Sequence, residues 1–315
     1  TGAKQVNIAS LLNALPGAAA QGLIWGIMAI GVFITFKVMD VADLTVDGTM
    51  CTGGAVSIMM LLNGLPMWFA LICACLAGMA AGAVTGLLHT KMGIPVLLSG
   101  ILTQLSLYSV NLKIMGKANQ AISFDRYNLL ISSRYINDPA TPWYKYPILT
   151  ASIFIVVIII VLYWFFGTEL GCAIRATGAN ENMARAQGIN TSAKKVLGLM
   201  ISNGLVALSS ALYCQYANFT DVNIGRGAIV IGLAAVIIGD VLFSKVFHNF
   251  ALKLLSVVFG AIIYYLVMQF VSWLGLDTDY MKLLSAAVVA VFLAVPYWKG
   301  KYFTKPAKRG ASLNA

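Results

Sequence analysis

The chain has 315 residues, of which 60% are hydrophobic and 10% are charged, and its mean hydropathy is +0.85. Soluble domains carry about 25% charged residues, so this composition excludes a soluble globular protein and indicates a polytopic membrane protein. The formal net charge of +10 comes from basic residues scattered through short loops and a tail, which fits loops facing anionic lipid and argues against a nucleic-acid surface.

About nine apolar stretches are long enough to span or nearly span a bilayer, so we expect an all-α polytopic fold. They lie at 17–36, 44–62, 66–88, 94–112, 147–166, 194–216, 227–243, 250–272 and 281–298. The expected organisation is a single transmembrane domain over 1–315, with repeat one at about 17–112, an outer loop at 113–146, an unpaired helix at 147–166, a coupling region at 167–193, repeat two at about 194–298 and a basic cytoplasmic tail at 299–315.

The chain repeats itself faintly. The stretch from Gly22 to Gly48 is echoed by the stretch from Gly198 to Gly225, since in each a span ends in a short polar link before a glycine-rich span begins. Spans one to four therefore pair with spans six to nine, and the fifth has no partner. An odd number of spans separates each pair, so the two halves are inverted, as in many transporters.

Positive charge orients the chain in the membrane. If the polar region 167–193 faces the cytoplasm, 13 of the 21 Lys and Arg residues lie inside. This places the N-terminus outside and the C-terminus in the cytoplasm. We expect a multi-pass protein of the inner (cytoplasmic) membrane.

A short polar helix interrupts the apolar stretches in mid-chain. Asn180 is a good N-cap, Glu181 suits the positive end of the helix dipole, and Gly188 suits a left-handed C-terminal position. We interpret this rod, about 10 Å long at the usual helical rise, as the handle by which another protein drives the apolar helices. The candidate contact residues are Asn180, Glu181, Asn182, Met183, Ala184, Arg185, Ala186, Gly188 and Ile189.

The fourth span carries polar side chains on two neighbouring helical stripes. These are Ser99, Thr103 and Ser106 on one stripe and Gln104, Tyr108 and Asn111 on the other. A polar stripe on an apolar helix lines an aqueous path or makes hydrogen-bonded helix contacts, and both interpretations stay open. These six residues are the candidates for a translocation path.

Two neighbouring spans are rich in small residues. In the second, Asp47 and the glycines at 48, 53 and 54 argue against an unbroken helix, because each glycine costs about 1 kcal/mol relative to alanine. Asp43 and Asp47 either cap this helix or take part in transport. The third span presents Ala70, Ala74, Gly78, Gly82 and Gly86 at successive i+4 positions, which predicts a close packing seam with another helix.

Several chemistries are missing from the sequence. There is no GxxxxGK[ST] loop for ATP, and neither GxSxG nor HExxH occurs. His89 and His248 are isolated from other metal ligands. We therefore expect neither an enzyme nor a cofactor or metal site in this chain.

Residues 171–210 resemble the permease subunits of ATP-binding-cassette (ABC) importers, in the group that includes branched-chain amino acid and ribose permeases. The resemblance rests on Gly171, Arg175, Ala176, Gly178, Asn180, Ala184, Gly188, Ile189, Asn190 and Lys194, followed by a span rich in small residues. The segment from Ala42 to Gly48 resembles a branch associated with aromatic amino acids. Among residues 1–315 we expect no counterpart of the additional N-terminal span that ten-helix relatives carry.

The resemblance implies partners and a role for each part. The chain would be the membrane subunit of an ATP-driven importer for a small solute such as an amino acid, and a second copy would complete the path as a homodimer. The helix at 180–188 would enter a groove of a separate ATPase, which would bind ATP and Mg²⁺. An extracytoplasmic binding protein would deliver the solute, and the fourth span would line the path at the dimer axis.

A self-sufficient secondary transporter or channel is the alternative, because inverted repeats occur there as well. Such a protein has no need of a capped polar helix in mid-chain, and it would carry buried carboxylates for ion coupling.

Overall fold

The computed structural model describes residues 8–123, 127, 129–136, 146–243, 246–247, 249–274 and 280–298. A helix lies over each of the nine apolar stretches, which confirms the all-α expectation. In chain order these helices are α1 (Ile8–Phe33, continued by the π-helical turn η1, Ile34–Val38), α2 (Thr45–Leu62), α3 (Met67–Thr90), α4 (Val96–Met115), α5 (Pro147–Gly167), α8 (Thr191–Ala217), α9 (Ala228–Phe243), α10 (Phe250–Trp273) and α11 (Met281–Trp298). The tail 299–315 and part of the loop 113–146 lie outside the described residues.

Within the described chain, six helical segments are long and apolar enough to cross a membrane. They are Leu11–Val38, Thr45–Leu62, Met67–Thr90, Pro147–Gly167, Thr191–Ala217 and Phe250–Trp273. The apolar helix α9 and the apolar part of α11 are shorter, and the polar side chains of α4 lower its hydropathy. The protein is therefore a multi-pass membrane protein.

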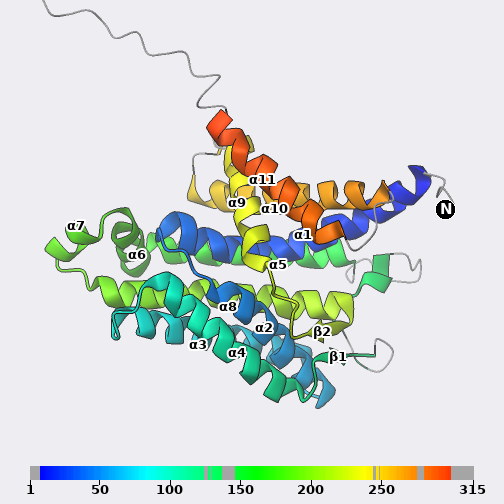
Figure 1. The fold of residues 1–315 in the computed structure, drawn as a ribbon, viewed down its shortest axis with the longest axis horizontal. Coiled ribbons are helices and arrows are strands. Elements are labelled where there is room, and N and C mark those ends of the chain that lie inside the picture. Colours follow the sequence, from blue (N-terminus) through cyan, green and yellow to red (C-terminus); the bar gives the residue numbers. More distant parts are fainter. Residues whose placement is uncertain are drawn as a thin grey trace, which may run out of the picture.

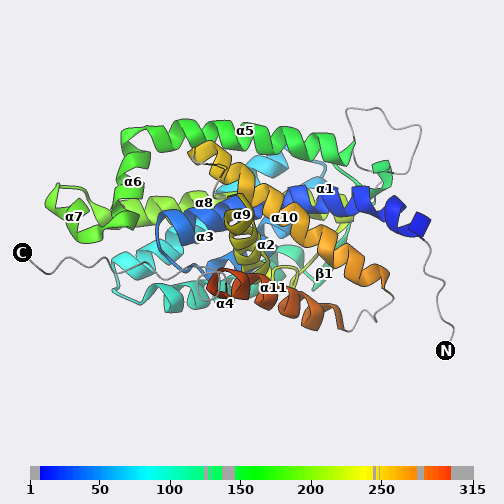
Figure 2. The same cartoon turned by 90° about the horizontal axis from the view of Figure 1, so that it is seen from above.

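The long helices α1, α3, α5, α8 and α10 run roughly along the longest axis of the molecule, and α9 runs across them (Figure 1). Two short helices, α6 (Glu169–Ala179) and α7 (Glu181–Ala186), lie together at one end (Figures 1 and 2). The core lies where α1 meets α8 and α10, and Ile24, Ile27 and Met28 of α1 are fully buried there.

The small-residue stripe of α3 packs against α8. A Cβ atom at Gly78 or Gly82 would overlap the backbone of α8 at Asn203 or Leu199. Glycine at these positions lets the two helices approach to backbone contact. The predicted packing seam is confirmed.

Helix α2 is continuous from Thr45 to Leu62, so the expectation of a broken second span is wrong. Its glycines lie at close contacts: a Cβ at Gly53 would overlap the backbone of Ala207 in α8, and one at Gly48 would lie 3.0 Å from the Cα of Gln104 in α4. The packing gained on both sides outweighs the low helix propensity of these residues, which is a weak preference that tertiary context overrides.

A short two-stranded ribbon was not predicted. Strand β1 (Asn119–Ala121) pairs antiparallel with β2 (Phe219–Asp221), with Gln120 opposite Thr220. The ribbon follows α4 and α8 and lies at the end of the molecule away from α7 (Figure 1). It therefore ties the ends of two distant helices together.

Candidate coupling helix and transport path

Helix α7 has the start and stop that its sequence predicts. The backbone N–H of Met183 donates to Asn180 Oδ1 at 3.0 Å, which is the expected N-cap. Gly188 has φ +80°, and no heavy atom of the described residues lies within 4 Å of a Cβ built on it. The N–H of Ile189 donates to the carbonyl of Ala184 at 3.0 Å. The left-handed residue thus ends the helix and turns the chain towards α8.

Three charged side chains hold α7 to the start of α8. Glu181 Oε1 accepts from Arg185 at 2.7 Å, and its Oε2 accepts from Lys195 of α8 at 2.7 Å. The Arg185 Nε also donates to Thr191 Oγ1 at 2.9 Å. The hydrogen bond from Lys195 lowers the pKa of Glu181 below its ordinary value, and the positive charges of Lys195 and Arg185 act in the same direction.

The outer face of α7 is free to meet a partner. Ala184 is buried against the body of the protein, whereas Met183 is 58% exposed. Asn182, Arg185 and Ala186 are also exposed. An apolar anchor surrounded by polar groups is suited to protein contact.

Sequence reasoning missed helix α6, which carries α7. Its N-cap is Thr168, whose hydroxyl accepts from the N–H of Gly171 at 3.4 Å, and Glu169 stands in its first turn. These two residues were a usable signal. At the other end of α6, a Cβ at Gly178 would overlap the backbone of Val38 in η1, so α6 lies in backbone contact with the end of α1.

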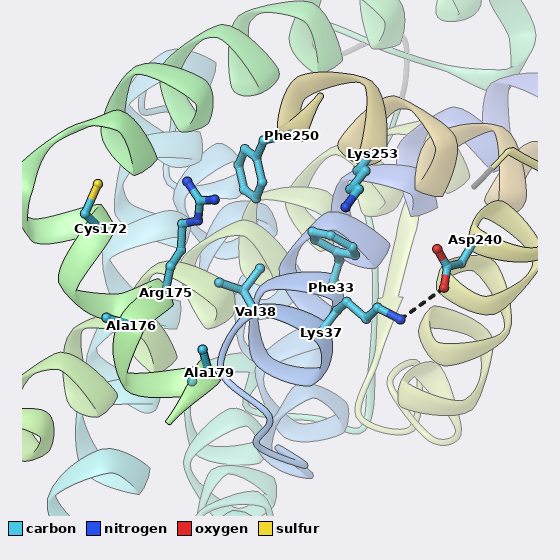
Figure 3. Close-up of a pocket in the computed structure, with 11 residues that line it drawn as sticks. Phe33, Lys37, Val38, Cys172, Arg175, Ala176, Ala179, Asp240, Phe250 and Lys253 are labelled. Carbon is cyan, nitrogen blue, oxygen red and sulfur yellow. Dashed lines mark hydrogen bonds and ion pairs between the residues drawn. The ribbon is translucent and has the colours of Figure 1, made fainter. Parts of the chain in front are cut away.

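An open cavity of about 650 Å³ lies between α6, η1, α9 and α10 (Figure 3). Across it, Lys37 Nζ lies 3.0 Å from Asp240 Oδ2. The Arg175 guanidinium lies 5.6 Å from the centre of the Phe250 ring, a cation–π distance. Helix α6 therefore contacts the end of α1 and the start of α10, elements from both expected repeats.

The six polar candidates of α4 divide into different environments. Ser99 and Thr103 are buried, and Thr103 accepts a hydrogen bond of 2.9 Å from Thr85 of α3. The hydroxyl oxygen of Thr85 in turn lies 2.7 Å from that of Thr45 in α2. This end of the stripe makes helix contacts. Ser106 is exposed and donates to the carbonyl of Leu102 in its own helix.

Gln104, Tyr108 and Asn111 instead line a second cavity of about 280 Å³, which we call the α4 cavity. Its other polar walls are Asp47 of α2 and Arg226 of the segment before α9. Sequence reasoning gave Arg226 no role, because nothing in the local pattern places it beside α4. The structure brings one acidic and one basic side chain to this cavity.

Both aspartates near the start of α2 accept backbone N–H groups. Asp43 Oδ1 accepts from the N–H of Thr45 at 2.9 Å in the first turn of α2, although Leu44 is the N-cap residue, and its Oδ2 accepts from Asn203 of α8 at 2.7 Å. Asp47 caps a different helix, since its carboxylate accepts from the N–H groups of Gly227 at 3.0 Å and Ile229 at 2.9 Å at the start of α9. The starts of α2 and α9 therefore meet beside the α4 cavity.

Two relatives of the chain are named as transport permeases. The tyrosine transport system permease protein of Clostridioides difficile (strain R20291) is 40% identical over 285 residues, which cover 90% of this chain and 91% of that protein. The ribose import permease protein RbsC of Escherichia coli (strain K12) is 22% identical over 288 residues, covering 90% of this chain and 85% of that protein.

A solved structure shares the fold. PsaBC from Streptococcus pneumoniae in complex with Fab matches with a TM-score of 0.53 and 16% identity, covering 94% of this chain and 100% of that chain. The family model described as "Branched-chain amino acid transport system / permease component" matches residues 15–293. This match spans most of the chain, so the protein belongs to the branched-chain amino acid transport system permease family.

Proposed function

We propose that this chain is the membrane subunit of an ATP-driven importer of an amino acid, with tyrosine as the first substrate to test. Helix α7 carries the proposal, because it is capped, ion-paired to α8 and exposed at one end of the molecule. The 40% identity to a protein named as a tyrosine transport permease supports the substrate class.

In this proposal a separate ATPase subunit binds ATP and Mg²⁺, and this chain carries neither a nucleotide nor another cofactor. The ATPase receives residues 180–189 in a groove. The exposed side chain of Met183 is the anchor of that contact, and the Glu181 network keeps α7 rigid enough to transmit force. Helix α6 passes the movement to η1 and α10.

The proposed topology has nine spans in two inverted halves, with the N-terminus outside and the C-terminus in the cytoplasm. Matching helix contacts support the inversion. Helix α3 packs on α8 as α10 packs on α1, α2 packs on α3 as α9 packs on α10, and α2 packs on α4 as α9 packs on α11. In each comparison, replacing every helix of spans one to four by its counterpart among spans six to nine, and the reverse, turns the first contact into the second. The two halves then rock when ATP binding draws the α7 helices together.

A second copy of the chain completes the path along α4 in the proposed homodimer. Exposed apolar side chains on this helix support that arrangement; they are Leu97, Leu98, Ile101, Leu102, Leu105, Val110 and Leu112. An extracytoplasmic binding protein delivers the amino acid at the end of the molecule that carries the β1–β2 ribbon. Lipid surrounds the remaining apolar faces, including α5, where Trp164 is 71% exposed.

Uptake into proteoliposomes tests this proposal. The permease is reconstituted with its ATPase and binding protein, and entry of labelled L-tyrosine is followed with and without ATP. We expect uptake only when ATP and the ATPase are both present. Uptake by the permease alone, driven by an ion gradient, would instead identify a secondary transporter.

A further inference from the structure

The α4 cavity holds two opposite charges that are not paired with each other. Asp47 accepts two backbone N–H groups, but no cation of the described chain lies within ion-pair distance of its carboxylate. Arg226 is exposed and likewise has no acidic partner among the described residues. An ionisable side chain inside a membrane protein is costly, and such residues usually serve a ligand or a pathway.

A third group in the cavity wall is a hydrogen-bond acceptor without a partner in the described chain. Asn111 is fully buried, and its Nδ2 donates to the carbonyl of Gly48 at 3.3 Å. Its Oδ1 is buried and has no hydrogen-bond donor among the residues that the structure describes. Buried polar groups nearly always have partners, so this oxygen calls for a donor that enters the cavity from outside the chain. Asp47 and Asn111 together offer acceptors to a cation.

We propose that the α4 cavity binds the ammonium and carboxylate groups of a single free amino acid. Asp47 and Asn111 Oδ1 accept from the ammonium group, and the Arg226 guanidinium pairs with the carboxylate, for which its forked donors are suited. Tyr108, which also lines the cavity and is 44% exposed, offers a ring to the amino acid's side chain.

The size of the cavity suits this ligand. Its volume of about 280 Å³ lies just below the range of about 300–1,000 Å³ that is typical of small-molecule pockets, so it takes one small molecule. The inference rests on the proposed function and adds a property to it. The permease itself selects zwitterions, and selection is not left to the binding protein alone.

Binding is measured on the full-length permease with its ATPase in lipid nanodiscs, without the binding protein, by titration calorimetry. The three probes are L-tyrosine, tyramine, which lacks the carboxylate, and 3-(4-hydroxyphenyl)propionate, which lacks the ammonium group. We expect L-tyrosine to bind at least tenfold tighter than either analogue. Equal binding of all three probes, or no binding of L-tyrosine, would overturn the proposal.

Arg226→Gln should weaken L-tyrosine binding at least tenfold and leave tyramine binding unchanged. Arg226→Lys should retain part of the preference for L-tyrosine over tyramine. Asn111→Leu should weaken L-tyrosine and tyramine but not the propionate. Lys113→Gln is the matched control, since Lys113 is an exposed cation on α4 that does not line the cavity. If Lys113→Gln loses the preference for L-tyrosine over tyramine, or if Arg226→Gln retains it, Arg226 is not the partner of the carboxylate.

Uptake by the complete system separates the two ideas. If ATP drives L-tyrosine uptake equally in the wild type and in Arg226→Gln, the binding site is wrong and the importer stands. If ATP drives no amino acid uptake at all, the proposed function is wrong whatever the titrations show.

Discussion

Reversing the charge of Glu181 is the sharpest test of α7 as a coupling helix. In Glu181→Lys the bonds to Arg185 and Lys195 are lost, and three cations then lie together at the helix start. Exposed ion pairs contribute about 0.2–1 kcal/mol each, and a carboxylate at a helix N-terminus contributes about 0.3–1 kcal/mol. Losing both ion pairs and the favourable interaction of the carboxylate with the helix dipole therefore destabilises the folded form of α7 by about 2 kcal/mol.

This cost is small beside the stability of a whole domain, about 5–15 kcal/mol, so the variant stays folded. A local change of about 2 kcal/mol shifts the population of an ordered α7 by about 30-fold, since 1.4 kcal/mol is a factor of ten. We expect ATP-driven uptake in proteoliposomes to fall at least tenfold, with the protein still inserted in the membrane. The charge swap Glu181→Lys with Lys195→Glu should recover part of the rate.

Glu169→Lys is the matched control for charge alone, because Glu169 is an exposed carboxylate at the start of α6 without an ion pair in the described chain. It should retain most of the uptake. If Glu181→Lys transports at the wild-type rate, or if both variants fail equally, α7 does not transmit force through this network.

Three further predictions follow from packing, backbone conformation and pH. Gly82→Leu should lower the unfolding temperature by several degrees, because its side chain would overlap the α8 backbone, while Val84→Leu on the exposed face of α3 should not. Gly188→Val should reduce uptake because a left-handed β-branched residue is strained, and Gly188→Asn, which tolerates that conformation, should retain it. Since the pKa of Glu181 is lowered, its ion pairing stabilises the protein fully at a pH above the ordinary pKa of 4.5 and less as the pH falls below it. The difference in unfolding temperature between the wild type and Lys195→Gln should therefore shrink as the pH falls below 4.5.

The sequence predicts those parts of the structure that local spacing determines. The i+4 run of small residues located the α3 seam, and the cap residues at 180 and 188 located the ends of α7. Contacts between distant segments have no local pattern. Lys195 reaches Glu181 across a turn, and Arg226 lines the same cavity as Asp47 only because α9 starts beside α2.

The polar stripe of α4 shows the same limit to what local spacing predicts. Helical periodicity indicates which side chains share a stripe, but the neighbouring helix decides what each one contacts. Thr103 meets a threonine of α3, whereas Gln104, one residue later, faces a cavity. For α2 the difference has a physical cause: glycine propensity predicts a break, whereas the close packing that glycine permits on both sides keeps the helix continuous.

The central claim is that a separate ATPase grips this chain at α7. Photo-crosslinking in native membranes tests it directly, with a photoreactive residue in place of Met183 and, as the control, in place of Trp68, which is 55% exposed on α3. We predict a product with the combined mass of permease and ATPase from position 183 and none from position 68. Failure to crosslink from 183, or a product from 68 alone, would contradict the claim.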